Sequence, residues 1–279
     1  MYRYIIGVLL TLLLATPVAA QNSYRIAEVA KGVYAAIAEP GGAATSNAMI
    51  VDLGTQVILC GAHFSRKAIN DLIAAATEVS PNPIRAFVLA HHHPGYTFID
   101  FDFPVRKDLV MTIGTRRIMK QEVRKLENPV IFFKEGLTFE GTERTLILTN
   151  VGPAHSNSDL IAYIPQSKVL FTSDLLYFNS VGFLGAGSLR AWAQVVDGLG
   201  ALRADKIIPG FGPIGTQKDL NKFRIYLKDF LTEVLRHIEN GDSLETTLRT
   251  FNLPQYKNLP GYESFTPGNI ERAYQQLKD

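Results

Sequence analysis

The stretch VLAHHHPGYTF, residues Val88 to Phe98, places three consecutive histidines at the end of an apolar run. The run IRAFVLA is continuous, which is typical of a strand buried on both faces. At the end of such a strand, His91 and His93 can converge on one point while His92 is directed away. Histidine is the commonest metal-binding side chain, because a neutral imidazole nitrogen suits cations such as zinc. The stretch therefore suggests a metal site at the end of a buried strand.

Strand and helix patterns alternate on both sides of this stretch. NAMIVDLGTQVILC predicts two strands joined by a tight turn at Asp52 to Thr55. SRKAINDLIAAATEV has apolar residues at helical spacing, and Ser65 is placed to cap that helix. Further strands are expected at 32–39, 144–151 and 206–209, a hairpin at 159–174, and helices at 115–127, 189–203, 216–237 and 269–278. The pattern predicts an α/β sandwich in two similar halves rather than two independent domains.

Composition excludes some classes of partner. The chain has 279 residues, 47% of them hydrophobic, which is enough to bury a substantial core. The net charge is +2 and charged residues are 19%, with no long run of one sign. Nucleic-acid binding normally requires a clustered basic face, so we expect no nucleic-acid partner.

The first twenty residues have the features of an export signal. Arg3 gives a short positive region, IIGVLLTLLLA is the apolar core, and PVAA ends in small residues. We expect a signal peptide at 1–20, cleaved before Gln21, and one domain at 21–279 with no stable membrane anchor. An uncleaved N-terminal anchor is the alternative. The single cysteine, Cys60, cannot form an internal disulfide, so an exported protein of this kind fits a periplasmic or secreted location.

Other chemistry-bearing residues also follow or end predicted strands. GPAHSNSD places His155 after a strand, and VLFTSD ends a strand on Asp174. IIPGFGPIG then turns sharply after another strand and contains Phe211. Loops at strand ends, held by a rigid scaffold, are the arrangement that builds a shared site at the rim of a sheet.

At these ordered motifs the chain resembles the metallo-β-lactamase superfamily, over nearly its whole mature length. HHHPGY overlays the family motif H-x-H-x-D-H, and AHSNSD matches the next motif at His155, with Asp159 as its closing acid. LFTSD matches the segment with the metal-bridging aspartate at Asp174, and IPGFGP matches IPGHGP. The resemblance implies a four-layered αββα sandwich with a metal cleft at one edge of the facing sheets.

The departures from the family pattern concern the second of its two metals. The resemblance implies that His91, His93 and His155 hold one metal, and all three are kept. The second-site positions carry Gly95, Tyr96 and Phe211 instead of an aspartate and two histidines, and only Asp174 remains. The aspartate that usually ends the second strand of the early hairpin is most closely matched by Gly61. We therefore expect one metal ion. His63 and His237 are interpreted as ordinary surface or packing residues.

Three functions are compatible with these residues. Three histidines with an open fourth position form a complete catalytic zinc site. Asp174 is a candidate both for a further metal ligand and for the general base. These residues predict slow hydrolysis of an ester, lactone or amide. A metal-poor pseudoenzyme acting as a binding or accessory protein is the first alternative. The second takes His91, His155 and Asp174 as an iron site like that of the family's sulfur dioxygenases. The apolar, glycine-rich loop after Asp174 favours a modestly hydrophobic small-molecule substrate or ligand, and Trp192 either lines the cleft mouth or packs in the core.

Overall fold

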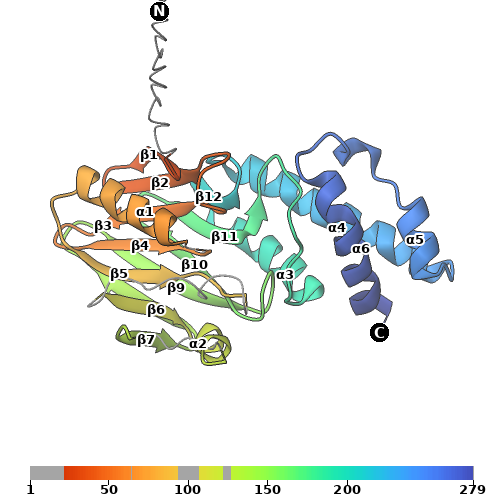
Figure 1. Ribbon diagram of the computed structural model, residues 1–279, viewed down its shortest axis with the longest axis horizontal. Coiled ribbons are helices and arrows are strands. Elements are labelled where there is room, and N and C mark those ends of the chain that lie inside the picture. Colours follow the sequence, from red (N-terminus) through yellow and green to blue (C-terminus); the bar gives the residue numbers. More distant parts are fainter. Residues whose placement is uncertain (1–21, 64, 94–106, 122–126, 279) are drawn as a thin grey trace, which may run out of the picture.

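Two β-sheets face each other in the computed structural model, which describes residues 22–63, 65–93, 107–121 and 127–278 (Figure 1). The first sheet has seven strands in sequence order, antiparallel from β1 to β4 and parallel from β4 to β7. Its strands are β1 Tyr24–Ala30, β2 Val33–Ala38, β3 Ala48–Asp52, β4 Val57–Gly61, β5 Ile84–Leu89, β6 Asp108–Thr112 and β7 Val130–Phe133.

The second sheet has five strands in the order β12-β11-β10-β9-β8. Only the pair of β11 and β12 is parallel. Its strands are β8 Gly136–Glu140, β9 Thr145–Gly152, β10 Asp159–Ile164, β11 Val169–Tyr177 and β12 Lys206–Phe211.

Helices cover the outer faces of both sheets. On the side of the first sheet lie α1 Arg66–Val79 and α2 Ile113–Met119. On the side of the second sheet lie α3 Leu189–Leu199, α4 Gln217–Glu239, α5 Leu244–Thr250 and α6 Tyr262–Lys278, with short 3₁₀ helices η1 Gly200–Leu202 and η2 Pro254–Tyr256. Figure 1 shows α4, α5 and α6 gathered at the end of the molecule that carries the C-terminus.

Three layers of buried hydrophobic side chains lie between the two sheets and the two layers of helices. Alternate side chains of a strand point to opposite faces, so β3 directs Met49 and Val51 between the sheets and Ala48 and Ile50 toward α1. On β11, Phe171 lies between the sheets, whereas Leu170 faces the helices of the other side. The fold is therefore the four-layered αββα sandwich that the motifs predicted.

Most predicted elements are present, with shifted ends at two helices. Ser65 caps α1, since its hydroxyl accepts a hydrogen bond from the amide of Ala68 at 3.1 Å. The helix expected at 115–127 begins earlier, because the hydroxyl of Thr112 caps it, and α2 ends at Met119. The last helix, expected from 269, begins at Tyr262 and contains Pro267. The expected signal peptide at 1–20 lies outside the described residues.

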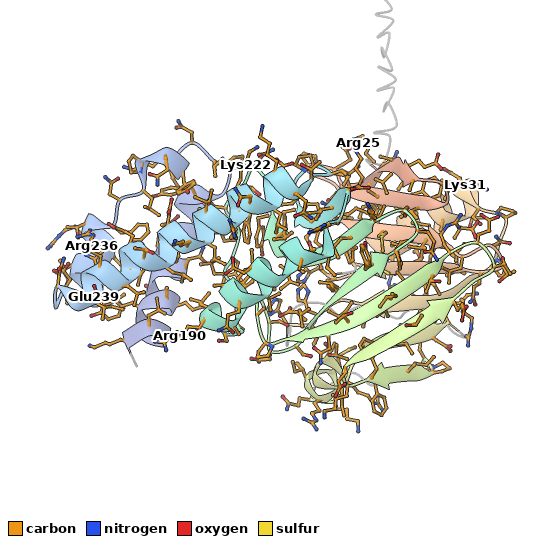
Figure 2. The ribbon with its side chains drawn as sticks, turned by 180° about the vertical axis from the view of Figure 1, so that it is seen from behind. Arg25, Lys31, Arg190, Lys222, Arg236 and Glu239 are labelled. Carbon is orange, nitrogen blue, oxygen red and sulfur yellow. The ribbon has the colours of Figure 1, made fainter. Side chains whose placement is uncertain are left out.

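Charged side chains lie along α4 on the surface of the helical side. Figure 2 shows Lys222 toward one end of this helix and Arg236 and Glu239 toward the other, while Arg25 and Lys31 lie at the strand end of the molecule. Across the described parts of the chain, every helix is too short or too polar to cross a membrane.

Candidate metal centre

The ends of neighbouring strands bring four histidines to one edge of the sandwich. His91 and His93 follow β5, and His63 follows the parallel neighbour β4, whose Gly61 is paired with Leu89. Pairing continues past the strand end, where the amide of Ala90 donates to the carbonyl of Gly61 at 2.9 Å. Because parallel strands end at the same edge of a sheet, these three histidines emerge together.

The second sheet supplies His155 and Asp174 from the opposite side. His155 lies in the loop between β9 and β10, and Asp174 lies within β11. The pairing of β11 with β12 shifts register on both sides of Ser173, whose φ is +48°. Gly210 of β12 is required there, because a Cβ on it would lie 2.6 Å from the carbonyl carbon of Ser173 and 2.7 Å from the Cα of Asp174. The irregular strand and the glycine together set the place of the Asp174 carboxylate.

Three imidazole rings form a nearly equilateral triangle. The ring centroids of His91 and His93 are 5.0 Å apart, those of His91 and His155 4.9 Å, and those of His93 and His155 4.9 Å. The rings meet edge to face, and the Nε2 atoms of His93 and His155 are 2.9 Å apart. The structure thus brings together the three histidines that the motifs singled out, and their role as ligands stays a prediction.

Asp174 faces this triangle, with its Oδ2 atom 3.7 Å from Nε2 of His91 and 3.8 Å from Nε2 of His155. Its nearest nitrogen is a different one, Nε2 of His63, at 3.0 Å. The same His63 atom lies 3.0 Å from Nε2 of His91. The interpretation of His63 as a surface or packing residue is therefore wrong, since its ring belongs to the cluster. The interpretation of His237 as a packing residue fits its buried place on α4, where its Nδ1 contacts Asp242 at 2.6 Å.

Burial determines the charge of these groups. It lowers the pKa of His91 well below its ordinary value, that of His93 to about 4 and that of His155 to about 3. Burial alone would raise the pKa of Asp174, but the neighbouring His63 and His91 outweigh it and hold that pKa below its usual range. The site therefore presents neutral imidazoles beside an ionised carboxylate, which are the protonation states that a metal ion requires.

The donor set fits a metal ion. Each neutral imidazole has one N–H, so with that proton on Nδ1 the Nε2 atom offers a lone pair, and the lone pairs of these neighbouring Nε2 atoms then point at one another. A cation between them would accept all of these lone pairs. Nitrogen ligands on tetrahedral zinc lie about 3.3 Å apart, close to the spacings of the Nε2 atoms in the cluster. His91 belongs to both sets of possible ligands, one with His63 and His93 and one with His155 and Asp174.

Buried hydrogen bonds hold the loop that carries His155. The Oδ2 atom of Asp159 accepts from the amides of Ala154 at 3.0 Å and Ser156 at 2.9 Å. The hydroxyl of Ser156 donates to Oδ1 at 2.8 Å. Burial raises the pKa of Asp159 to about 7, against the effect of these hydrogen bonds. Asp159, the last residue of the AHSNSD motif, therefore holds the His155 loop in place through these hydrogen bonds. Asp159 is not itself part of the histidine cluster.

Asn47 joins the two sheets at the edge that carries the cluster. Its side-chain amide donates to the carbonyls of Pro209 at 3.0 Å and Gly212 at 2.9 Å. Its backbone amide donates to the carbonyl of Gly210 at 2.8 Å. The sequence analysis did not single out this residue, because a lone asparagine before a strand carries no signal of contacts made 160 residues later.

A largely apolar cavity of about 710 Å³ opens on the cluster. It is lined by His63, His93, His155 and Asp174 and by Thr45, Tyr177, Ser180, Val181, Gly182, Phe183, Ala186, Phe211, Pro260, Gly261 and Phe265. Phe211 stacks on Tyr177 with ring centroids 5.0 Å apart, so this position presents an aromatic face where the family has a histidine. Gly95 and Tyr96, the other two substituted positions, lie outside the described residues.

Trp192 lies behind the site rather than at its mouth. Its side chain is buried, its indole nitrogen donates to the carbonyl of Leu175 at 3.0 Å, and its ring centroid is 5.4 Å from that of His155. Phe183 is the aromatic residue of the preceding loop that reaches the cavity, with 43% of its surface exposed.

Comparisons with known proteins agree with this architecture. A search of curated proteins finds no match. Among solved structures, a metallo-β-lactamase from Pontibacter korlensis is 18% identical with a TM-score of 0.61, and covers 74% of this chain and 99% of its own. The DIM-1 metallo-β-lactamase exposed to ceftazidime is 16% identical with a TM-score of 0.58, covering 74% and 97%. TMB-1 is 18% identical with a TM-score of 0.59, covering 74% and 98%.

At such identities the structural likeness shows the fold alone. The sequence itself gives the family, because residues 41–210 match the model of the metallo-β-lactamase superfamily. That range includes the four clustered histidines and Asp174, and it makes up more than half of the chain. The chain, with its histidine-rich cluster suited to a metal ion, belongs to the metallo-β-lactamase superfamily.

Proposed function

We propose that the protein is a metal-dependent hydrolase that uses one zinc ion to cleave an uncharged ester, lactone or amide with an apolar substituent. The observation that carries the proposal is the triangle of His91, His93 and His155 beside Asp174, at the cavity wall. Zinc held by three histidines supplies a Lewis acid that activates water near neutral pH. The spacing of the rings and the neutral state of the imidazoles support binding of such an ion.

Asp174 is the proposed proton acceptor. Its carboxylate is buried and ionised, and its Oδ2 atom faces the space between the histidine nitrogens and the cavity. A carboxylate in that position can accept a hydrogen bond from a water molecule beside the substrate and then take its proton. Because the pKa of Asp174 lies below its usual range, the group is a weak base, which is consistent with slow turnover.

The cavity favours a neutral, apolar substrate. Val181, Phe183, Phe211 and Phe265 contribute aromatic or aliphatic surface to its lining. The described lining residues include no lysine or arginine that could pair with a carboxylate or phosphate on the substrate. An anionic group away from the metal would therefore lose its hydration without gaining a partner among these lining residues. We propose export to the periplasm as the setting, on the basis of the signal-like residues 1–20.

Ester hydrolysis by the zinc-loaded protein tests this function. We expect p-nitrophenyl esters to be cleaved, chelation to abolish the activity and zinc to restore it. Asp174→Asn should retain zinc and lower turnover, whereas His93→Ala should lower zinc affinity at least about 10-fold. His237→Gln is the matched histidine control and should leave zinc content unchanged. Absence of hydrolysis by the zinc-loaded wild type would refute the hydrolase, and failure to take up any metal would favour the binding-protein alternative.

Phe265 tests the proposed preference for apolar substrates. Removing its ring would expose a bound apolar group, at a cost of about 1 kcal/mol, which corresponds to a loss of about 5-fold in kcat/KM. Phe265→Ala should show this loss on a long-chain ester and little change on an acetyl ester. Equal losses on both esters would contradict the assignment of this wall to the substrate.

One observation favours a second candidate. The ligand atoms of His91, His155 and Asp174 all lie within 4.8 Å of one another, which makes a set of two histidines and one carboxylate suited to mononuclear iron(II). An iron-loaded protein of this kind would consume oxygen together with a sulfur-containing substrate, as the resemblance to the sulfur dioxygenases implies. In that case His93→Ala would keep the metal and Asp174→Asn would release it, the reverse of the zinc prediction.

A further inference from the structure

We infer that His63 is a fourth nitrogen ligand of the single metal ion. His63 lies in none of the family motifs that the chain matches. Its Nε2 atom lies 3.0 Å from Nε2 of His91 and 3.0 Å from Oδ2 of Asp174. Its ring is stacked on that of His93, with centroids 5.6 Å apart and planes 10° from parallel. His63 therefore contacts three members of the cluster, His91, His93 and Asp174.

The loop around His63 is anchored on both sides. The carbonyl of Ala62 accepts a hydrogen bond from the hydroxyl of Ser46 at 3.3 Å. On the other side, the hydroxyl of Ser65 donates to the carbonyl of Ala43 at 3.0 Å. Between these anchors His63 has a φ of +51°, a conformation that is uncommon outside glycine, although asparagine, aspartate and histidine adopt it more often than other residues. Strain of this kind persists where the surroundings require it and is concentrated at functional sites.

One ion is favoured over two by the number of donors. Besides His93 and His155 of the triangle, Asp174 and His63 are the only histidine, cysteine or carboxylate side chains among the described lining residues. Phe211 offers no ligand atom. A zinc ion normally takes four ligands. Asp174 and His63 supply only two ligand atoms, so they would form a poor site for a second ion. His63 and His91, by contrast, are close enough to bind the same ion, together with His93 of the same set.

This inference rests on the metal-binding part of the proposed function and not on hydrolysis. With four histidines bound, water would have to join as a fifth ligand or displace one of them, an expansion that zinc permits. His63 would be the displaceable ligand, because its Nε2 atom has Asp174 as an alternative partner at 3.0 Å. A ligand of this kind would hold the resting ion more tightly and slow the reaction.

X-ray absorption at the zinc edge of the purified protein counts its imidazole ligands directly. We expect four imidazoles in the wild type and three in His63→Gly, a variant chosen because glycine accepts the positive φ. Zinc affinity, measured by competition with a chromophoric chelator, should fall at least about 10-fold in this variant. Millimolar imidazole should restore it by filling the vacated space.

Ser65→Ala is the matched control, because it removes the hydrogen bond that anchors the same loop but leaves every proposed metal ligand in place. It should keep four imidazoles and an affinity within about 2-fold of the wild type. Three imidazoles in the zinc-loaded wild type, or an equal loss of affinity in Ser65→Ala and His63→Gly, would overturn the role of His63 while leaving the hydrolase proposal intact. A wild type that binds no zinc would overturn both.

Discussion

Replacing Asp159 with alanine should destabilise the fold and loosen His155 at the same time. The substitution removes the acceptor for the amides of Ala154 and Ser156 and for the Ser156 hydroxyl. Ala154 and Ser156 are 0% and 1% exposed, so water cannot replace the carboxylate. Each buried donor left without an acceptor costs about 1–3 kcal/mol, so the two amides together predict a loss of about 2–6 kcal/mol. The Ser156 hydroxyl keeps a contact, since it accepts from the amide of Ser158 at 3.1 Å.

Urea unfolding followed by tryptophan fluorescence measures this loss. The chain has one tryptophan, and its ring lies 5.4 Å from that of His155, so the signal comes from the site itself. Asp159→Asn is the control: its side-chain carbonyl can still accept from both amides, and the loss should be under about 1 kcal/mol. Zinc affinity should fall in the alanine variant alone. A loss of less than about 1 kcal/mol for Asp159→Ala would refute the claim that this carboxyl group supports the His155 loop.

Three other predictions follow, two from the structure and one from the sequence of the first twenty residues. Burial raises the pKa of Asp159 from its ordinary value of 3.8 to about 7, so the folded state holds this proton more tightly. The resulting stability is complete below about pH 4 and is lost as the pH rises through about 7, and urea midpoints across this range should show a dependence that Asp159→Asn removes. Gly210→Ala should cost about 1–3 kcal/mol in urea unfolding by separating β12 from Asp174, while Gly198→Ala in α3, where a Cβ meets nothing within 4 Å, should not destabilise. Intact-mass analysis of exported protein should find Gln21 as the first residue, and retention of residues 1–20 would contradict the signal peptide.

Local patterns were enough to predict most of the sandwich. The turn at Asp52 to Thr55, the capped α1 and the buried strand before His91 each follow from a few neighbouring residues, and each is present. The strands β1, β6, β7 and β8 and the short helix α5 were missed. β6 and β7 are largely apolar but only five and four residues long, and β8 is partly exposed with no continuous apolar run. The start of α6 was missed because Pro267 suggested a linker, although the helix accommodates it.

The candidate site was predictable only where its residues follow known motifs. His91, His93, His155 and Asp174 could be found in this way, and the structure places them together. His63 could not, because its position depends on the parallel pairing of β4 with β5 and on a positive φ, neither of which leaves a signal in the surrounding sequence. The available signal was its place three residues after a predicted strand, at the same edge as the other strand ends.

The cavity draws its walls from two parts of the chain, one within the range that matches the superfamily and one beyond it. The clustered histidines lie within residues 41–210, which match the superfamily, whereas Pro260, Gly261 and Phe265 lie beyond that range. Asn269 of α6 ties the parts together, since its side chain accepts from the amide of Leu184 and donates to the carbonyl of Gly182, both at 2.9 Å. Mutations in the C-terminal helices can therefore change which molecules reach the histidines without altering a single ligand. Under the proposed function, such variants would change substrate preference while the metal-binding residues stay the same.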